Sequence, residues 1–468
     1  GASGYLGSVL VKQLVDQGYT VRGSVRDVHK WQVDPFFKTM SDSGRMTLFQ
    51  ADLLKQGSFT EAFKGCQVIF HTASPFWTKV TDPQKELIDP AVAGTKNVLA
   101  AATAAQTVQR VVLTSSVAAV TPQNPKPTDL TKVFTEDDWH LDSDLTNGPY
   151  RMSKRVAEQA AWDHVKAPGG TQFDLVVINP SFILGPGVLD RSDGVSVKFM
   201  RDALEGRLVA GTPQGAFGVA DVRDVASAHI AGMFQPEAGG KRFLVSSDTT
   251  FTQLEMLNML QTTSQQEFNR FALPETEQAP ATFRPRFSPA RRQQILKTQV
   301  RPTADTVIEM ARWVVERGTY NHAVATRMGD AAKACQTQPA AQRKTCIDAV
   351  ALKVDGMTPR STCALEFEKL CAQERAPANL DDGTNKCGNC VQNNIAAFEF
   401  AACTPQVLAE LCAGPAVPAA PAAPANVDCQ GSWSACTAAC EKGDARTWTQ
   451  TTAASGTGKA CPTAAPDC

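Results

Sequence analysis

The 468-residue sequence lacks an excess of charge of either sign, because 46 lysines and arginines stand against 47 aspartates and glutamates. Proteins that bind nucleic acids or anionic membranes usually carry a basic excess, so the balance argues against both kinds of partner. The sequence also lacks an uninterrupted apolar run of the roughly 18 residues that a membrane-spanning helix requires. With 43% hydrophobic and 20% charged residues, the composition is that of a globular protein without a membrane span.

Cysteine is nearly absent from the first 334 residues, which contain Cys66 alone, whereas the other 13 cysteines lie between Cys335 and Cys468. The first part therefore has the composition of a reduced, cytoplasmic protein, and the second has the cysteine density of secreted modules held by disulfides. All six histidines precede residue 323, which excludes a cysteine–histidine zinc site in the cysteine-rich part. Four-cysteine zinc sites remain open there, but no metal site is predicted.

Residues 1 to about 250 alternate short β-branched runs with longer helical patterns, which is typical of a parallel α/β sheet. We predict a Rossmann-type, doubly wound parallel sheet with a small substrate-binding lobe. This first unit spans residues 1–320, with the lobe mainly in 181–215 and 250–320, and the strand that should precede its first motif is missing from the sequence. The expected strands are Thr20–Val25, Met46–Gln50, Gln67–His71, Arg110–Ser115 and Leu175–Asn179, and the longer expected helices are Asp89–Ala105, Tyr150–Val165 and Thr303–Arg317.

The segment GASGYLG at the start of the sequence spaces its glycines G-x-x-G-x-x-G and leads into a helical pattern. Glycines in such a turn let the backbone approach a diphosphate at the N-terminus of the helix. The alternative is a glycine-rich turn that only closes a βα unit. The predicted dinucleotide contacts in this segment are Gly1, Ser3, Gly4, Tyr5, Leu6 and Gly7.

The end of the second expected strand indicates which dinucleotide is bound. An acidic residue at this place binds the ribose hydroxyls of NAD, but here Val25 ends the strand and Arg26 follows. A guanidinium binds the oxygens of a 2′-phosphate in a bidentate manner, so Arg26 favours NADP(H); a solvated loop charge is the alternative. Asp52, after the next strand, either accepts a hydrogen bond from the adenine amino group or is a carboxylate at a helix N-terminus.

Tyr150 and Lys154 lie four residues apart in an expected helix and therefore on one face of it. An ammonium group close to a phenol lowers the pKa of the phenol, which makes proton transfer near neutral pH easier. We therefore predict that Tyr150 protonates a substrate carbonyl oxygen. The expected strand Arg110–Ser115 ends in two hydroxyls, Ser115 and Ser116, at the sheet edge where ligands bind in such folds. One of the two serines can orient the carbonyl, and capping of the strand end is the alternative role.

Seven motifs in order resemble the extended short-chain dehydrogenase/reductases, in particular dihydroflavonol reductases, cinnamoyl-CoA reductases and yeast-type aldehyde and ketone reductases. They are GASGYLG, VRGSVRD, ADL, FHTASP, RVVLTSS, YRMSK with RVAEQAAW, and INPSFILGPG, and ADVRDVASAHI follows them. The resemblance implies NADPH-dependent reduction of a carbonyl substrate with Ser116, Tyr150 and Lys154 as the catalytic residues. It also implies cofactor contacts from Leu53, Thr72, Ala73, Ser74, Ser115, Pro180 and Ser181, with Tyr150 and Lys154 touching the cofactor as well.

Two departures from these relatives bear on the substrate. Thr121 stands where dihydroflavonol reductases typically carry an amide side chain, and the segment Asn147–Lys154 replaces the NWYCYGK signature of cinnamoyl-CoA reductases. The sequence therefore predicts an aldehyde or ketone reductase with a broader range of substrates than these two plant enzymes. His71 and His229 are interpreted as structural histidines without a catalytic role.

The cysteine-rich part divides into three predicted segments: a helical cysteine-rich module at 330–413, a Pro/Ala linker at 414–426 and a small disulfide-rich β module at 427–468. The eight cysteines of residues 335–412 form an even set that favours disulfides, although Cys387 and Cys390 form a C-x-x-C motif that also occurs in redox and zinc sites. Residues 427–468 resemble a thrombospondin type 1 repeat through W-S-x-C-x-x-x-C, with Trp433 and Arg446 in its stacking pattern. This resemblance implies an extracellular location and binding of an extracellular protein or glycan.

The two parts predict different locations, cytoplasmic for the first unit and extracellular for the cysteine-rich tail, and the sequence does not show whether the fusion is natural. The function it favours is NADPH-dependent reduction of a small carbonyl substrate. One alternative is an NAD-dependent nucleotide-sugar epimerase or dehydratase, which shares the tyrosine, lysine and glycine motif. The other is a non-catalytic extracellular binding protein with an adhesion tail.

Overall fold

The computed structural model describes residues 1–74, 80–189, 194–262 and 267–320, four single residues beyond these (325, 328, 335 and 346), and two strands near the end of the chain. The chain divides into two compact units, Gly1–Ile347 and Asp348–Cys468. Most of the predicted cysteine-rich module, the Pro/Ala linker and most of the thrombospondin-like module lie outside the described residues.

The centre of the first unit is a parallel sheet in the order β3-β4-β6-β9, formed by Val68–His71, Arg110–Thr114, Asp174–Pro180 and Lys241–Val245. A separate parallel pair consists of β1 (Val21–Val25) and β2 (Met46–Gln50). All five predicted strands are present, with ends that differ by at most one residue. The predicted parallel α/β fold is therefore confirmed for this part of the chain.

A groove of about 610 Å³ lies between the two sheets and is lined by residues of α1, β1 and β3. Its walls include the apolar side chains of Leu10, Val11 and Leu14 and the backbone of Val21–Ser24. No described strand hydrogen-bonds to both β1 and β3. In the predicted fold, a strand precedes the glycine motif, and the groove is the place where that strand would lie.

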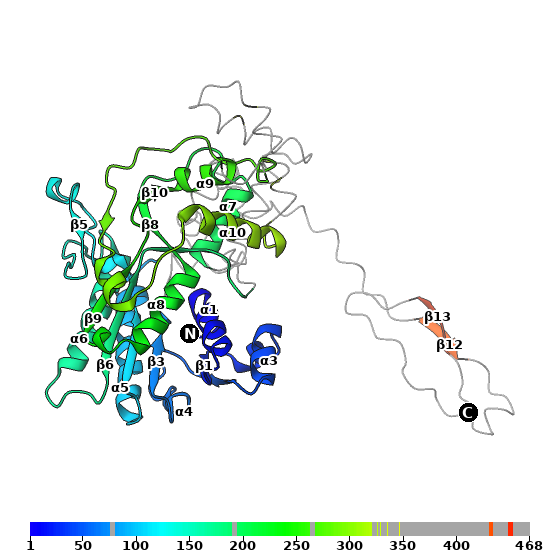
Figure 1. Ribbon diagram of the computed structural model, residues 1–468. Coiled ribbons are helices and arrows are strands. Elements are labelled where there is room, and N and C mark those ends of the chain that lie inside the picture. The colour runs from blue at the N-terminus through cyan, green and yellow to red at the C-terminus, as the bar shows by residue number, and fades with distance from the viewer. Residues whose placement is uncertain are drawn as a thin grey trace, which may run out of the picture. The chain divides into compact units, whose positions relative to one another are not determined.

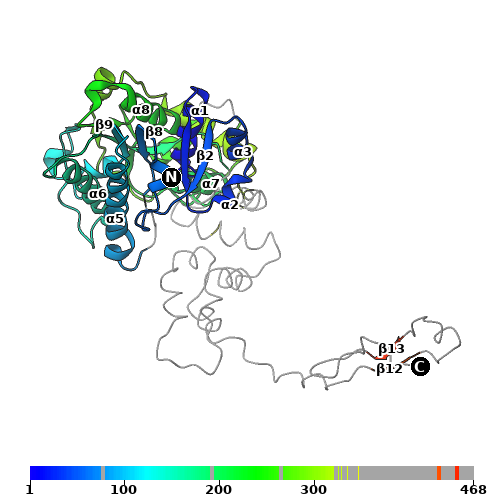
Figure 2. The ribbon, with the colours of Figure 1, turned by 90° about the horizontal axis from the view of Figure 1, so that it is seen from below.

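Helices cover both faces of the central sheet (Figures 1 and 2). On one face, α1 (Tyr5–Asp16) packs with α8 (Val222–Phe234) over Val112, Val176 and Ile178 of β4 and β6. On the other face, α5 (Asp89–Ala104) packs with α6 (Pro149–Lys166) over the alternate residues of the same strands. Because successive strand residues point to opposite faces, a strand covered on both sides is apolar throughout.

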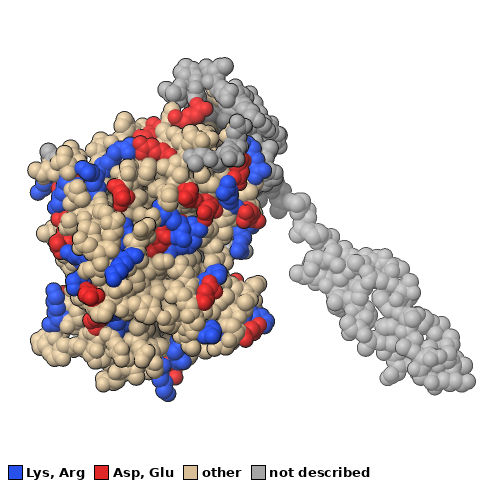
Figure 3. All heavy atoms as spheres, viewed as in Figure 1, with Lys and Arg blue, Asp and Glu red and all other residues tan. Residues whose placement is uncertain are grey.

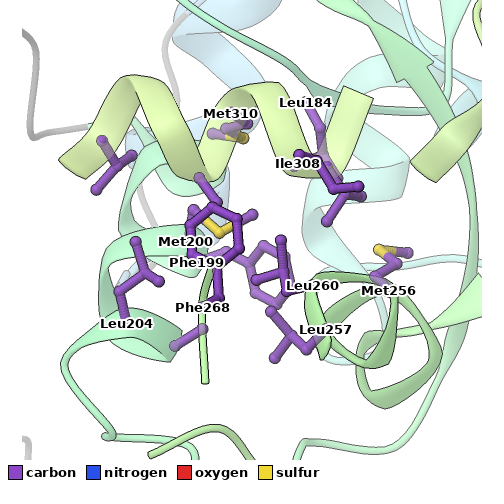
Figure 4. Close-up of a cluster of buried hydrophobic side chains, with 14 of the residues drawn as sticks. Leu184, Phe199, Met200, Leu204, Met256, Leu257, Leu260, Phe268, Ile308 and Met310 are labelled. Atoms are coloured by element: carbon purple, nitrogen blue, oxygen red, sulfur yellow. The ribbon is translucent and has the colours of Figure 1, made fainter. Parts of the chain in front are cut away.

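A lobe with its own core lies beside the carboxyl ends of the strands (Figure 1). Its helices are α7 (Val195–Leu204), α9 (Gln253–Thr262) and α10 (Thr303–Glu316), and its sheet consists of β7 (Phe182–Leu184), β8 (Ala216–Asp221) and β10 (Thr250–Thr252). Figure 4 shows the core, in which Met200, Leu257 and Met310 are fully buried. These three residues come from three different helices, so the core holds distant parts of the sequence together.

The first compact unit continues past the predicted boundary near Tyr320. Ala325 is buried in the core of the lobe, and the side chain of Met328 lies next to Gly206, at 2.7 Å from the position of a Cβ there. Cys335 is fully buried and forms a disulfide with Cys346. The unit therefore closes at Ile347, because residues beyond 320 bury side chains against the lobe.

The remaining elements are short. The described part of the first unit also contains α2 (Val28–Gln32), α3 (Pro35–Asp42), α4 (Thr60–Phe63), β5 (Val133–Phe134), β11 (Arg286–Phe287), three 3₁₀ turns (Val117–Ala119, Pro127–Asp129, Pro236–Ala238) and two π-helical turns (Gln84–Ile88, Arg292–Leu296). In the second unit, β12 (Gln430–Trp433) pairs antiparallel with β13 (Trp448–Thr452), and Trp433 stands opposite Trp448.

The face of the molecule shown in Figure 3 carries no dominant charge. On the face shown in Figure 3, lysines and arginines are interspersed with aspartates and glutamates. Among the described residues, no helix has the length and apolar character needed to cross a bilayer.

Candidate functional site

The glycine-rich turn brings the chain so close to itself that no side chain fits. A Cβ on Gly7 would lie 2.1 Å from the carbonyl oxygen of Gly1, and a Cβ on Gly1 would lie 2.7 Å from Thr72 Oγ1. Helix α1 begins at Tyr5 without a side-chain cap, and the amide of Ser8 donates to the carbonyl of Gly4 at 2.9 Å. The amides of Tyr5, Leu6 and Gly7 therefore stand in the first turn of the helix, where an anion can accept their hydrogen bonds.

Two arginines near the end of β1 differ in what they contact. Arg22 Nε donates to the carbonyl of Ala62 at 3.0 Å, and its guanidinium lies 4.1 Å from the centre of the Phe49 ring. Arg26 is exposed and forms no hydrogen bond or ion pair within the residues that the structure describes. Arg26 is therefore free to meet a phosphate, whereas Arg22 serves the packing of β1 and α4.

Asp52 and Leu53 lie in the turn after β2. Asp52 Oδ1 accepts a hydrogen bond from the amide of Leu54 at 2.8 Å, and the next helix begins only at Thr60. The alternative role of Asp52 at a helix N-terminus is therefore wrong, because its carboxylate caps a turn. Leu53 is half-buried, and its carbonyl accepts from Asn97 Nδ2 at 2.9 Å. Binding of adenine by Asp52 stays a prediction.

Thr72, Ala73 and Ser74 follow β3 directly. The would-be Cβ of Gly1 lies 3.0 Å from both the Cβ and the amide nitrogen of Ala73, which shows that this segment and the turn are in contact. Ser74 is exposed. The structure thus brings the two predicted cofactor segments together at one edge of β3.

The two serines after β4 have different partners. Ser115 Oγ donates to the buried carboxylate of Glu158 at 2.6 Å, so the side chain of Ser115 is directed into the protein and is not available to a cofactor. Ser116 Oγ accepts from the amide of Ala118 at 3.1 Å and is hydrogen-bonded to the phenol of Tyr150. Ser116 combines the capping role with a position beside the predicted proton donor.

Tyr150 and Lys154 occupy the first turns of α6, as predicted. Lys154 Nζ lies 5.7 Å from the centre of the Tyr150 ring, and burial lowers the pKa of Lys154 to about 8. Burial also raises the pKa of Tyr150, which outweighs the opposing effects of the Ser116 hydrogen bond and of the Arg151 charge. The predicted lowering of this pKa by Lys154 is therefore wrong, because desolvation of the phenol dominates.

Pro180 and Ser181 end β6 beside β9. The amide of Ser181 donates to the carbonyl of Val245 at 3.0 Å, and the side chain of Ser181 is buried. Asn179, just before them, donates from Nδ2 to the carbonyl of Ser116 at 3.2 Å. The ends of β4 and β6 are thus joined at the edge of the sheet that carries Ser116.

The contact between Arg151 and Thr121 was not predicted. Arg151 Nη1 donates to both the carbonyl and Oγ1 of Thr121, at 3.0 and 2.7 Å. Thr121 is 1% exposed, so its hydroxyl serves the protein itself. The sequence gives one signal for this contact, because the cation Arg151 directly follows Tyr150. It gives no indication that Thr121, 30 residues earlier, is the partner of Arg151.

The two histidines interpreted as structural are buried. Burial lowers the pKa of His71 to about 3 and that of His229 to about 4, so both rings are neutral at pH 7. His229 contacts the Val225 carbonyl through Nδ1 at 2.7 Å and Thr114 Oγ1 through Nε2 at 2.6 Å. Within the described ranges, no three histidine, cysteine or acidic side chains gather where a metal ion could bind.

The order of the parallel strands, together with the glycine turn at the start of α1, defines the class: a dinucleotide-binding α/β protein. Within this class, the chain belongs to the NAD dependent epimerase/dehydratase family, whose model matches residues 1–246.

Several of the similar proteins are named as reductases. Cinnamoyl-CoA reductase CAD2 of Medicago truncatula is 40% identical over 261 residues, which are 54% of this chain and 77% of that protein. A bifunctional dihydroflavonol 4-reductase/flavanone 4-reductase of Pyrus communis is 33% identical over 262 residues, 54% of this chain and 73% of that protein. Among solved structures, yeast methylglyoxal/isovaleraldehyde reductase Gre2 complexed with NADPH has a TM-score of 0.61 at 26% identity and covers 69% of this chain and 98% of its own.

These comparisons confirm the predicted resemblance to the dihydroflavonol, cinnamoyl-CoA and yeast-type reductases. The first unit is thus a member of an oxidoreductase family with a Rossmann-like sheet. They do not test the resemblance of residues 427–468 to a thrombospondin repeat, which stays a prediction.

Proposed function

We propose that the first compact unit reduces an aldehyde or a ketone to an alcohol with NADPH. The glycine turn offers a backbone cradle for the diphosphate, and the unpaired guanidinium of Arg26 fits the 2′-phosphate. The yeast reductase with a similar structure is complexed with NADPH. The residues that would hold the cofactor are those of the glycine turn, Arg26, Thr72 and Ala73, with Lys154 at the ribose of the nicotinamide.

The bound cofactor supplies the hydride, and the side chains of this chain supply the proton and the electrostatic stabilisation. Because burial raises the pKa of Tyr150, its phenol is protonated at pH 7 and can donate to the carbonyl oxygen. Ser116 holds this phenol by a hydrogen bond, and when a substrate is bound its single O–H can turn to donate to the carbonyl oxygen instead. The Lys154 ammonium, close to the ring, stabilises the negative charge that develops on the phenol as its proton leaves.

The observation that carries the proposal is the hydrogen bond between Ser116 and Tyr150 with a buried lysine beside the phenol. The test is NADPH consumption by the full chain at pH 7 against a panel of aliphatic and aromatic aldehydes and ketones, with Tyr150→Phe as the control. We expect turnover of at least one carbonyl class by the wild type. Absence of turnover across the panel, with NADPH bound, would refute the proposal.

A nucleotide-sugar epimerase or dehydratase is the alternative that shares this site. Such enzymes usually retain the acidic residue at the end of the second strand, which is Val25 here. Release of nucleotide from the purified protein separates the two functions, because tightly held NAD without NADPH turnover would favour the alternative. The third candidate function, non-catalytic binding, would be carried by the cysteine-rich tail. If the same assay finds that neither NAD nor NADPH binds, this candidate function remains.

A further inference from the structure

A buried carboxylate lies directly behind the proposed catalytic residues. Glu158 is on α6, one turn after Lys154 and two turns after Tyr150, and is 1% exposed. Its Oε2 accepts from Ser115 Oγ at 2.6 Å and from Asn179 Nδ2 at 2.9 Å. On the other side, Oε1 accepts from Arg242 Nε at 2.6 Å and from Trp162 Nε1 at 3.2 Å.

These donors come from the ends of β4 and β6, which carry proposed site residues, from β9, and from α6 itself. Ser115 directly precedes Ser116 after β4, and Asn179 is in β6 just before Pro180. Arg242 belongs to β9 and also donates to the carbonyls of Glu136 and Asp138, at 2.9 and 2.6 Å. The carboxylate thus ties α6 to the carboxyl ends of β4 and β6 and to the beginning of β9.

Asn179 makes the most direct link to the site. Its Nδ2 donates both to Glu158 and to the carbonyl of Ser116, whereas its Oδ1 is buried and has no partner among the described residues. A buried amide oxygen without a partner is unfavourable. Asn179 therefore acts through its two N–H groups, which link the carboxylate of Glu158 to the backbone carbonyl of Ser116.

We propose that Glu158 is a positioning residue, which through Asn179 and Ser115 fixes Ser116 against the phenol of Tyr150. This inference rests on the proposed function for its kinetic consequence, because the pair it positions is the one assigned to the carbonyl oxygen. A charge that is buried and fully hydrogen-bonded has a single favourable arrangement. It can therefore hold two hydroxyls within the small tolerance that proton transfer requires.

The kinetic test compares Glu158→Gln with a matched control on the same two strands. Arg110 and Asp174 form a bidentate ion pair, with both contacts at 2.7 Å, at the amino ends of β4 and β6. Asp174→Asn therefore breaks a β4–β6 link at the opposite edge of the sheet. We expect Glu158→Gln to lower kcat roughly 10–100-fold while the KM for NADPH stays within about 2-fold, and Asp174→Asn to leave kcat unchanged. Equal kcat losses in both variants would mean that Glu158 only stabilises the fold, and would overturn the proposal.

A spectroscopic test does not depend on turnover. The chain has four tyrosines, so the difference in tyrosinate absorbance between a protein and its Tyr150→Phe variant isolates the titration of Tyr150. Asn179→Leu changes no charge and also serves if Glu158→Gln does not fold. Because Ser116 lowers the pKa of Tyr150, loosening Ser116 by Asn179→Leu should raise the midpoint by roughly 0.5–1 pH unit.

The two tests separate this inference from the proposed function. An unchanged Tyr150 midpoint in Asn179→Leu overturns the positioning role whether or not the wild type reduces carbonyls. If Asn179→Leu raises the Tyr150 midpoint but the wild type does not reduce any carbonyl, the positioning role is supported and the proposed reaction is refuted. Wild-type kcat in Glu158→Gln, with normal turnover of the parent protein, would overturn the inference alone.

Discussion

Substitution of Arg26 by alanine tests how the cofactor is selected. The side chain is exposed and has no hydrogen-bond or ion-pair partner within the described residues, so its removal should cost the fold almost nothing. A charge-assisted hydrogen bond contributes about 1.5–3 kcal/mol, and exposure to solvent and salt reduces this toward the lower limit. We therefore expect kcat/KM for NADPH to fall roughly 10–30-fold in Arg26→Ala.

The same substitution should leave the use of NADH nearly unchanged, because NADH has no 2′-phosphate for the guanidinium to contact. The assay is kcat/KM for NADPH and NADH with one carbonyl substrate at low and high salt. Lys30→Ala is the control, since Lys30 is an exposed cation four residues further on that tests general attraction to the phosphate. Equal losses with NADPH and NADH, or equal effects of Lys30→Ala, would show that the phosphate is bound elsewhere.

Three further predictions concern proton transfer and acid stability. Tyr150→Phe should lower kcat at least ~100-fold with little change in NADPH affinity by fluorescence titration, and wild-type kcat would remove Tyr150 from the mechanism. Because the pKa of Lys154 is about 8, the reduction rate should fall as pH rises through that value, and Lys154→Arg should move this limb to higher pH in the rate profile. His229 has a pKa of about 4 when folded and about 6.5 when unfolded, so its contribution to stability is complete above pH 6.5 and is lost as pH falls toward 4, by about 1.4 kcal/mol per pH unit. Urea unfolding at pH 7 and pH 5 measures the slope, which should be smaller in His229→Asn than in the wild type, while His71, whose pKa is lowered to about 3, continues to contribute in the same direction.

Three strands of the central sheet, β3, β4 and β6, could be predicted to within one residue because they are short apolar runs covered by helices on both faces, whereas β9 was not predicted. Val111, Val112 and Leu113 of β4 are each at most 5% exposed, and such short apolar runs are distinct from the helical patterns between them. The lobe could not be predicted in the same way. Its core joins α7, α9 and α10, whose sequences are about 50 residues apart, and the continuation to Ala325 depends on packing that no local pattern encodes.

The site shows the same division. Ser116, Tyr150 and Lys154 were found because each is next to a local signal, a strand end or a helical spacing of four. The role of Glu158 was not, because its partners Ser115, Asn179 and Arg242 are 43, 21 and 84 residues away. The sign of the Tyr150 pKa shift was also missed. Spacing reveals which charges are near a phenol, but desolvation depends on the whole surrounding fold.

The groove between β1 and β3 leads to a last prediction about how the two halves of the site are held together. The glycine turn and Arg26 belong to the β1–β2 side, whereas Ser116 and Tyr150 belong to the central sheet, and no described strand links the two. The contacts that join them include those of α1, which packs on α8 and whose Tyr5 hydroxyl donates to the carbonyl of Gly185, and that of Asn97 in α5 with the carbonyl of Leu53 after β2.

An added strand should therefore strengthen this junction. The amide of Ala2 already donates to the carbonyl of Ser24 at 3.0 Å, so five valine or isoleucine residues placed ahead of Gly1 would continue this ladder into the groove of about 610 Å³. Even about 1 kcal/mol of net gain from apolar burial raises Tm by roughly 1–2 °C in a unit of this size. The control is a five-residue Gly/Ser extension, which offers the same backbone without side chains to bury. If both extensions give the same Tm and the same NADPH affinity, the groove does not receive a strand, and the existing contacts alone hold the two halves of the site together.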